Sequence, residues 1–263
     1  MVIDVHVHTQ SPGAQFNPRE VEDAKRLAAH AGVDRVVYLF NLGTGGRDPS
    51  PDDIRASNDL GMRLVESDPD FFMAFCYLNP SHDPEFSLAE IDRCIVRGNM
   101  IGIKLWVSVH ASDPRLDPIM RRAAELGIPV LHHAWYKMTR YEYNESNPRE
   151  IADLARRHPD VTIIMAHLAG VRWRGILDVK PYPNVCVDTS GGQPDAGLVE
   201  FAVQELGPER VLFGSDWPLR DFTVQKARVT GSAISQEAKA MILGGNAQRI
   251  LGLQGGKERR GHV

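Results

Sequence analysis

His6 and His8, near the start of the chain, are separated by a single residue. Imidazole nitrogens are common ligands of zinc and other divalent transition metals. In a β-strand, alternate side chains face the same side, so this spacing places both rings on one face, about 7 Å apart. Two such rings can share one ion. The pair alone is equally compatible with two unrelated histidines, so a metal site needs further ligands.

Further candidate ligands stand where apolar runs of the sequence stop. His132 and His133 end one run, His167 follows a second, and Asp216 follows a third. Any one of them alone is best explained as a core residue with satisfied hydrogen bonds. Four matching run ends, counting His6 and His8 together, favour one shared site of imidazole and carboxylate groups, which are ligands that suit zinc.

The runs that position these residues are short, apolar and rich in β-branched side chains. Nearly continuous apolar runs of this length are typical of parallel strands that are buried on both faces. The predicted strands are Val2–His8, Arg35–Phe40, Phe72–Tyr77, Ile101–Val107, Pro129–His133, Thr162–Ala166, Val185–Asp188 and Val211–Gly214.

Helix start signals lie between the predicted strands. Most combine a capping residue with a proline at the first helical position, and Gly32 and Gly127 are stop signals. The predicted starts are Asn17-Pro18, Ser50-Pro51, Asp83-Pro84, Asp117-Pro118, Asn147-Pro148 and Ser235-Gln236.

This alternation of strand and helix predicts an α/β fold, a single (β/α)8 TIM barrel with a C-terminal helix. An open doubly wound sheet normally has a glycine-rich loop after its first strand, and here that place holds His8-Thr9-Gln10-Ser11. We expect one catalytic domain over residues 1–254 and a flexible tail over residues 255–263. Active sites of such barrels lie at the carboxyl ends of the strands, where the candidate ligands stand.

The composition limits the class of protein. The formal net charge is −4, and 43% of the 263 residues are hydrophobic. These values argue against a nucleic-acid-binding protein and against a polybasic membrane-surface segment. The apolar runs are too short to span a bilayer, and the first residues do not resemble a signal peptide, so we expect neither a membrane span nor a leader. Three widely spaced cysteines predict reduced thiols, so we expect a cytoplasmic protein.

Several segments together resemble the amidohydrolase superfamily. They are Ile3-Asp4-x-His6-x-His8, Ala166-His167-Leu168, Leu212-Phe213-Gly214-Ser215-Asp216-Trp217-Pro218 and Gly245-Asn246-Ala247-Gln248-Arg249-Ile250-Leu251. The closer likeness is to the amidohydrolase-related (amidohydrolase 2) branch. That branch includes aminocarboxymuconate-semialdehyde decarboxylase, resorcylate decarboxylases and 2-pyrone-4,6-dicarboxylate lactonase. The resemblance extends over nearly the whole chain, but it does not indicate the substrate.

The resemblance implies one divalent ion, most often Zn²⁺ with Mn²⁺ as an alternative, held by four side chains. The implied ligands are His6, His8, a histidine of the fifth strand and Asp216. The branch pattern Ile-Pro-Val-Leu-x-His favours His133 over His132. His167 would either support the ligands or act as a catalytic imidazole beside the ion, and Asp216 would also orient the activated water and accept its proton.

Lys104, on the fourth predicted strand, has three interpretations. It could anchor a substrate carboxylate, pair with a neighbouring acid, or carry a carbamate that bridges two ions, as in binuclear amidohydrolases. The predicted substrate-binding residues are Lys104, Trp106, Tyr136, Arg172 and Trp217.

The main hypothesis for the function is a mononuclear hydrolase that activates water for attack on an ester, lactone or amide of a small carboxylated substrate. The alternative is a non-oxidative decarboxylase of an aromatic or unsaturated acid. A barrel that has lost its chemistry and only binds is a third hypothesis. The expected partner is a small molecule, with no nucleic acid or membrane, and the resemblance suggests a homo-oligomer.

Overall fold

The computed structural model describes residues 1–137, 144–192 and 195–253, and it alternates strands with helices along the chain. The strands are β1 (Ile3–Thr9), β2 (Arg35–Asn41), β3 (Phe72–Ala74), β4 (Cys76–Leu78), β5 (Ile103–Leu105), β6 (Val130–His132), β7 (Ile163–Met165), β8 (Val185–Asp188) and β9 (Val211–Leu212). The α-helices are α1 (Pro18–Ala31), α2 (Pro51–Ser67), α3 (Pro84–Ile91), α4 (Asp117–Leu126), α5 (Pro148–Arg157), α6 (Leu168–Val179), α7 (Leu198–Leu206), α8 (Phe222–Thr230), α9 (Gln236–Ala240) and α10 (Asn246–Ile250).

All eight predicted strands are present, and each pairs in parallel with its neighbours in chain order. The predicted third strand, residues 72–77, is divided at Phe75 into β3 and β4, which pair on opposite sides. Phe75 still donates its backbone N–H to the Tyr38 carbonyl of β2 at 2.9 Å. The division is therefore a bend in one continuous barrel strand.

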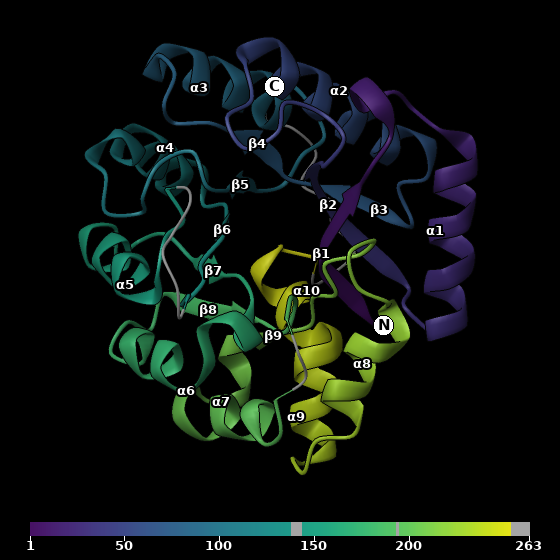
Figure 1. Ribbon diagram of the computed structural model, residues 1–263, viewed down its shortest axis with the longest axis vertical. Helices are drawn as coiled ribbons and strands as arrows, with labels where there is room; N and C mark the ends of the chain where they lie inside the picture. Colours follow the sequence, from purple (N-terminus) through teal and green to yellow (C-terminus); the bar gives the residue numbers. More distant parts are fainter. Residues whose placement is uncertain (138–143, 193–194, 254–263) are drawn as a thin grey trace.

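Backbone hydrogen bonds also join the first strand to the last. Val5 donates to the Phe213 carbonyl at 3.0 Å, and Asp216 donates to the His6 carbonyl at 2.8 Å. The bend between β3 and β4 joins the three-stranded and six-stranded sheets on one side, and these two bonds join the sheets on the other side. Figure 1 shows the resulting ring of strands with helices around it. The fold is the predicted α/β TIM barrel.

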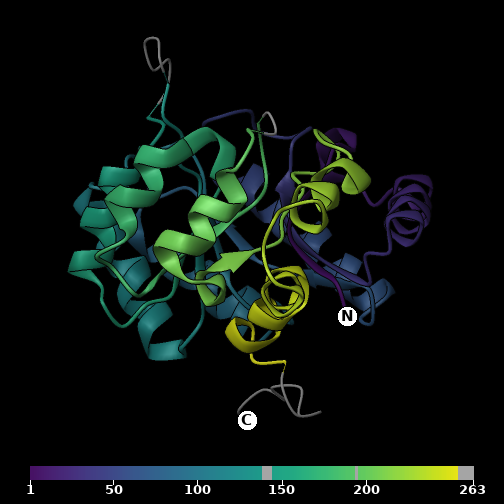
Figure 2. The ribbon, with the colours of Figure 1, turned by 90° about the horizontal axis from the view of Figure 1, so that it is seen from below.

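Alternate strand residues form two separate apolar layers, as the pleat requires. Inward-facing residues such as Val5, Leu131 and Ile164 fill the barrel, whereas their neighbours pack against the helices. Ala247 of α10 belongs to the inner layer. Helix α10 therefore closes the amino-terminal end of the barrel, beside the start of β1 (Figure 2). The opposite end, where the carboxyl ends of the strands lie, holds the candidate ligands.

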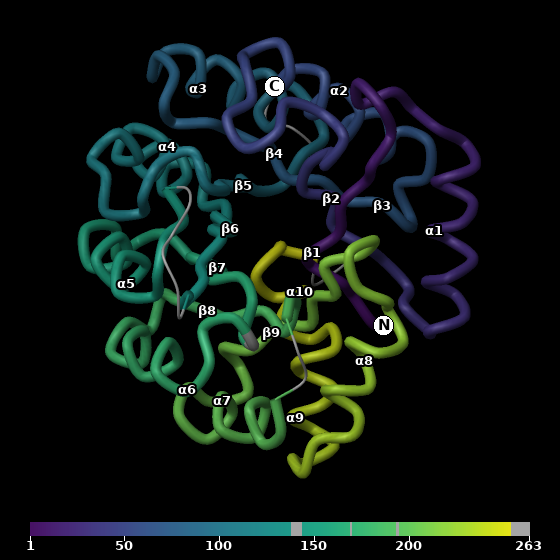
Figure 3. Tube along the Cα trace, viewed as in Figure 1, coloured from purple at the N-terminus to yellow at the C-terminus, as the bar shows by residue number. Residues whose placement is uncertain are grey.

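Local signals explain where the helices begin and end. Asn17 caps α1 with a side-chain hydrogen bond, and Gly32 ends it in the left-handed conformation at φ 65°. Ser50 and Asn147 form capping boxes at the starts of α2 and α5. Helix α8 lies beside α1 (Figure 3), and Lys226 of α8 donates to the Ala31 carbonyl at 2.7 Å.

The three cysteines are unpaired and buried, as expected for reduced thiols. Among the described residues, no helix has both the length and the apolar character needed to cross a membrane. The predicted tail, residues 255–263, lies outside the described residues.

Candidate metal centre

His6, His8 and Asp216 meet at the carboxyl end of the barrel. The ligand atoms of the three side chains all lie within 4.8 Å of one another, and all three residues are buried. Asp216 Oδ1 is 3.6 Å from His6 Nε2 and 3.4 Å from His8 Nε2. The two rings of β1 face the same side, as their spacing predicts, with centroids 5.2 Å apart.

The other ring nitrogen of each histidine is held by a group that accepts a hydrogen bond. His6 Nδ1 lies 2.8 Å from the Asp188 carboxylate, and His8 Nδ1 lies 3.1 Å from the Phe40 carbonyl. Carboxylates and carbonyls accept and do not donate, so each Nδ1 carries the proton. Both Nε2 lone pairs are then available on the side of Asp216, which is how histidine ligands of metals are usually oriented.

The protonation states also suit a cation. Burial lowers the pKa of His8 to about 4, which keeps its imidazole neutral at physiological pH. Burial acts to raise the pKa of Asp216, but its close contact with His8 and the nearby histidines hold it well below its ordinary value. Two imidazoles beside an ionised carboxylate are a donor set for a divalent ion, so these residues fit the metal that the resemblance implies.

Backbone contacts fix Asp216 in place. Its φ of 70° lies in the left-handed region, which a non-glycine residue adopts at a cost in energy. Asp4 supports this turn because one oxygen of its carboxylate accepts from the backbone N–H groups of His6 and Ser215, at 2.9 and 3.0 Å. A single carboxylate thereby ties the first ligand strand to the segment that carries Asp216.

A second group of buried side chains adjoins the three ligands. His167 and Asp188 lie with His6 within the same 4.8 Å limit, and Ser190 Oγ is 3.0 Å from His167 Nδ1. Burial lowers the pKa of His167 well below its ordinary value, so its ring is neutral. A neutral imidazole has one N–H, so His167 can donate a hydrogen bond to a negatively charged substrate oxygen in exchange for its contact with His133.

His133 contacts His167 and a carboxylate, and it is not part of the three-ligand group. Its Nε2 lies 2.6 Å from Glu145, and its Nδ1 lies 2.9 Å from His167 Nε2. Strand parity places His133 on the inner side with Leu131, whereas His132 directs Nδ1 to its neighbour's carbonyl at 2.7 Å. The choice of His133 over His132 as the fourth ligand remains a prediction.

Comparisons with known proteins identify the family of the chain. A family model described as amidohydrolase matches residues 3–253. The chain belongs to the amidohydrolase family. It is 22% identical to a γ-resorcylate decarboxylase of Polaromonas sp., over 89% of this chain and 88% of the relative. It is 25% identical to a 2-amino-3-carboxymuconate-6-semialdehyde decarboxylase of Dictyostelium discoideum, over 76% and 66% of the respective chains.

Solved amidohydrolase structures share the fold. A 2,6-dihydroxybenzoate decarboxylase from Rhizobium superimposes with a TM-score of 0.78 at 18% identity, over 97% of this chain and 99% of that chain. A dihydroxybenzoic acid decarboxylase from Polaromonas sp., solved with bound manganese and the inhibitor 2-nitroresorcinol, gives a TM-score of 0.77 at 17% identity, over 96% and 97%. Likenesses at this level of identity establish the TIM-barrel architecture.

Lys104 lies inside the barrel of this amidohydrolase, at the carboxyl end of β5. Its side chain is 1% exposed, and its Nζ is 5.8 Å from the centroid of the Phe40 ring. Burial lowers the pKa of the ammonium group to about 8, although the charges of Asp188 and Asp216 act in the opposite direction. A buried cation beside the ligand group is a candidate anchor for an anionic substrate.

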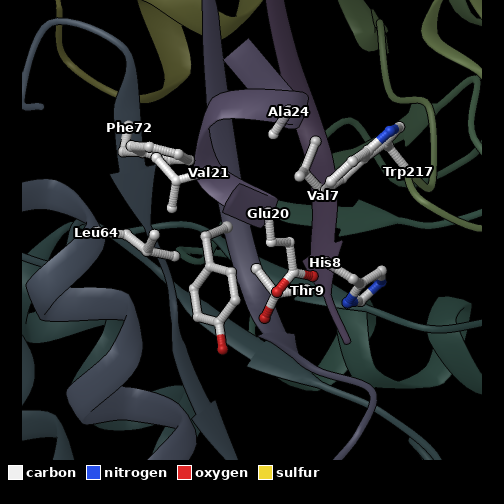
Figure 4. Close-up of a pocket in the computed structure, with 10 residues that line it drawn as sticks. Val7, His8, Thr9, Glu20, Val21, Ala24, Leu64, Phe72 and Trp217 are labelled. Atoms are coloured by element: carbon white, nitrogen blue, oxygen red, sulfur yellow. The ribbon is translucent and has the colours of Figure 1, made fainter. Parts of the chain in front are cut away.

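The other predicted substrate-binding residues have different surroundings. Trp106 packs its ring 4.8 Å from that of Phe40, close to Lys104. The side chains of the remaining three residues have other partners. Tyr136 donates to Asp178 of α6, and the exposed Arg172 lies 3.5 Å from Asp195. Trp217 stacks on Phe222 and lines a cavity between β1 and α1 (Figure 4). The ion pair of Arg172 therefore lies outside the ligand group, whereas the Trp217 carbonyl accepts a hydrogen bond from the backbone N–H of His8 at 2.7 Å.

Sequence reasoning assigned neither a catalytic nor a ligand-orienting role to Asp188, although the segment Asp188–Gly192 resembles one that shapes the pocket floor in the family, and it did not identify Glu145. Asp188 ends β8, so the strand-end rule that selected Asp216 could have found it. Glu145 lies in the loop after β6, twelve residues from the His133 that it contacts. Nothing in the local pattern there indicates an active-site residue.

Replacing Asp188 by Asn is expected to weaken metal binding by about 10- to 100-fold. The one oxygen of asparagine would keep accepting from the backbone N–H groups of His167 and Ser190, so its amide NH₂ group would face His6 Nδ1. Metal titration with a competing chelator measures this affinity. Asp113→Asn is a matched control, because it makes the same chemical change at Asp113, whose side chain caps a short helical turn by accepting from the Arg115 backbone N–H. Equal affinities for Asp188→Asn and the wild type would contradict the orienting role.

Replacing Gly191 by Ala is expected to reduce turnover by about 10-fold or more while metal binding is retained. Gly191 has a φ of 72°, and an added Cβ would lie 2.5 Å from His167 Nδ1. The substitution must therefore displace the His167 ring or the loop. Steady-state kinetics at equal metal content measures the effect. The control is Gly46→Ala, which has a similar φ of 56° and no atom within 4 Å of the added Cβ.

Proposed function

We propose that the chain is a metal-dependent, non-oxidative decarboxylase of a small aromatic or unsaturated carboxylic acid. The observation that carries this proposal is the group of His6, His8 and Asp216, beside a neutral His167 and the buried ammonium of Lys104. The group offers ligands to a cation, and Lys104 offers a charge to a carboxylate. The matched relatives named above are decarboxylases, which supports this alternative over the hydrolase hypothesis.

Decarboxylation breaks one carbon–carbon bond, leaves its electron pair on the substrate and places a proton on the same carbon. A bound divalent ion would act as a Lewis acid that holds substrate oxygens and withdraws electron density. Lys104 would pair with the carboxylate before it leaves. His167 would donate its one N–H to a negatively charged oxygen in exchange for its contact with His133, and we assign to Asp216 the transfer of a proton from solvent to the substrate carbon.

We infer one divalent ion per chain, Mn²⁺ or Zn²⁺. Imidazole and carboxylate ligands accommodate both metals, and a manganese ion is bound in one related decarboxylase. Elemental analysis of protein purified without chelators distinguishes the two metals and gives the stoichiometry. Two ions per chain would instead favour the bridging carbamate at Lys104.

The experiment that tests the function is a carbon dioxide release assay on metal-loaded protein. The substrates are hydroxybenzoates and unsaturated dicarboxylic acids, with esters and lactones of the same acids assayed in parallel for hydrolysis. We expect carbon dioxide release from at least one free acid. Hydrolysis of an ester or lactone without carbon dioxide release would restore the hydrolase hypothesis and overturn this proposal.

A further inference from the structure

Tyr77, at the carboxyl end of the barrel, has a buried hydroxyl with no hydrogen-bond partner among the described residues. The residue is 2% exposed and belongs to the inner layer of the barrel. Leaving a buried donor unsatisfied costs about 1–3 kcal/mol, so such groups are uncommon and need an explanation. A polar substrate atom that accepts the hydrogen bond would provide one.

The position of Tyr77 links it to the proposed substrate site. Tyr77 of β4 pairs in register with Lys104 of β5, so both side chains project from the same face of adjacent strands. The Tyr77 ring stacks on Phe40 at 4.5 Å, and the Phe40 ring lies 4.3 Å from the ring of His8. Trp106 packs on Phe40 from the same region.

These contacts define an aromatic wall made of Phe40, Tyr77 and Trp106, which extends away from the ligand His8. Aromatic side chains pack favourably against a planar ring. Two polar groups lie at this wall. The Lys104 ammonium, close to Phe40, can pair with a carboxylate, and the Tyr77 hydroxyl can donate to a neutral acceptor. Burial raises the pKa of Tyr77 far above physiological pH, so the hydroxyl keeps its proton and acts as a donor.

We propose that Tyr77 determines specificity by donating a hydrogen bond to a ring hydroxyl of an aromatic acid whose carboxylate pairs with Lys104. The inference rests on the proposed function for the carboxylate. It adds a ring hydroxyl as a second substrate group that the site recognises. A site built to bond a substrate hydroxyl discriminates strongly against the analogue that lacks it. Tyr77 thus selects a dihydroxylated acid over the monohydroxylated acid that lacks the bonded hydroxyl.

The test is calorimetric titration of the manganese-loaded protein with 2-hydroxybenzoate and with the 2,3-, 2,4-, 2,5- and 2,6-dihydroxybenzoates. We expect at least one dihydroxybenzoate to bind about 10-fold more tightly than 2-hydroxybenzoate, a factor that corresponds to one well-formed hydrogen bond. Tyr77→Phe keeps the ring and removes only the hydroxyl, so it should abolish this preference while 2-hydroxybenzoate binds as before.

Tyr38→Phe is the matched control. Tyr38 is equally buried in the neighbouring strand β2, but its hydroxyl faces outward and lies 3.0 Å from Ser57 Oγ. This variant should keep the preference of the wild type. Thermal melting and metal content establish that each variant is folded and loaded.

The outcomes separate this inference from the proposed function. A preference that survives Tyr77→Phe, or no preference in the wild type, overturns the role of Tyr77 even if carbon dioxide is released. A preference that Tyr77→Phe abolishes, without carbon dioxide release from any acid, supports the role of Tyr77 in binding and overturns the decarboxylase proposal alone.

Discussion

Asp216→Asn is expected to lower kcat/KM by about 1,000-fold or more, because one substitution removes a ligand charge and the group assigned to proton exchange. The Asp216 carboxylate faces both ligand imidazoles at 3.4 and 3.6 Å. Asparagine has nearly the same shape but is neutral, and it cannot accept a proton at physiological pH. Metal affinity should fall as well, since two neutral imidazoles attract a divalent ion less strongly than two imidazoles with a carboxylate.

Two measurements separate these effects. Metal content after dialysis reports the ligand role, and kinetics at saturating metal reports the proton role. Asp113→Asn serves again as the control, because it makes the same chemical change in a surface turn. A fully active Asp216→Asn enzyme would end both the hydrolase and the decarboxylase hypotheses, because each of them depends on this carboxylate.

The sequence was sufficient to predict the barrel because burial determines its pattern. Strands covered on both faces are apolar throughout, and the helices between them begin at capping residues, as at Asn17 and Asn147. The bend at Phe75 was not predictable, because the run of residues 72–77 is apolar on both sides of it. Whether a strand changes its pairing partner depends on barrel curvature, which leaves no signal in one short run.

The sequence predicted the meeting of His6, His8 and Asp216 for a similar reason. Each stands at a strand end, and a barrel brings strand ends to one face. Tyr77 illustrates what the sequence could not give. Within an apolar run it resembles any other core aromatic residue, and only the described contacts reveal that its hydroxyl has no partner. Likewise, the contact of Asp188 with His6 joins residues 182 positions apart.

Lys104→Met is expected to lower kcat/KM by roughly 100- to 1,000-fold, as for the loss of one partner of a buried ion pair. Methionine is of similar length and apolar, so the aromatic wall should keep its packing. The effect should appear mainly in KM if Lys104 only binds the carboxylate. Lys25→Met is the matched control, because it makes the same chemical change at the surface, where Lys25 pairs with Asp68.

The same variant should be more stable than the wild type, and the pH dependence gives the sign. The pKa of Lys104 falls from 10.5 to about 8 on folding, so below pH 8 both states are protonated and the folded state carries the whole penalty, about 3 kcal/mol. Between pH 8 and 10.5 the unfolded state binds more protons, so wild-type stability rises with pH. In urea unfolding with chelator present, the free energy of unfolding should therefore be higher for Lys104→Met than for the wild type at pH 7. This difference in free energy should shrink towards pH 10. A difference that does not change over this range would show that the ammonium of Lys104 is not destabilised by burial, and the site would then need another cation for the carboxylate.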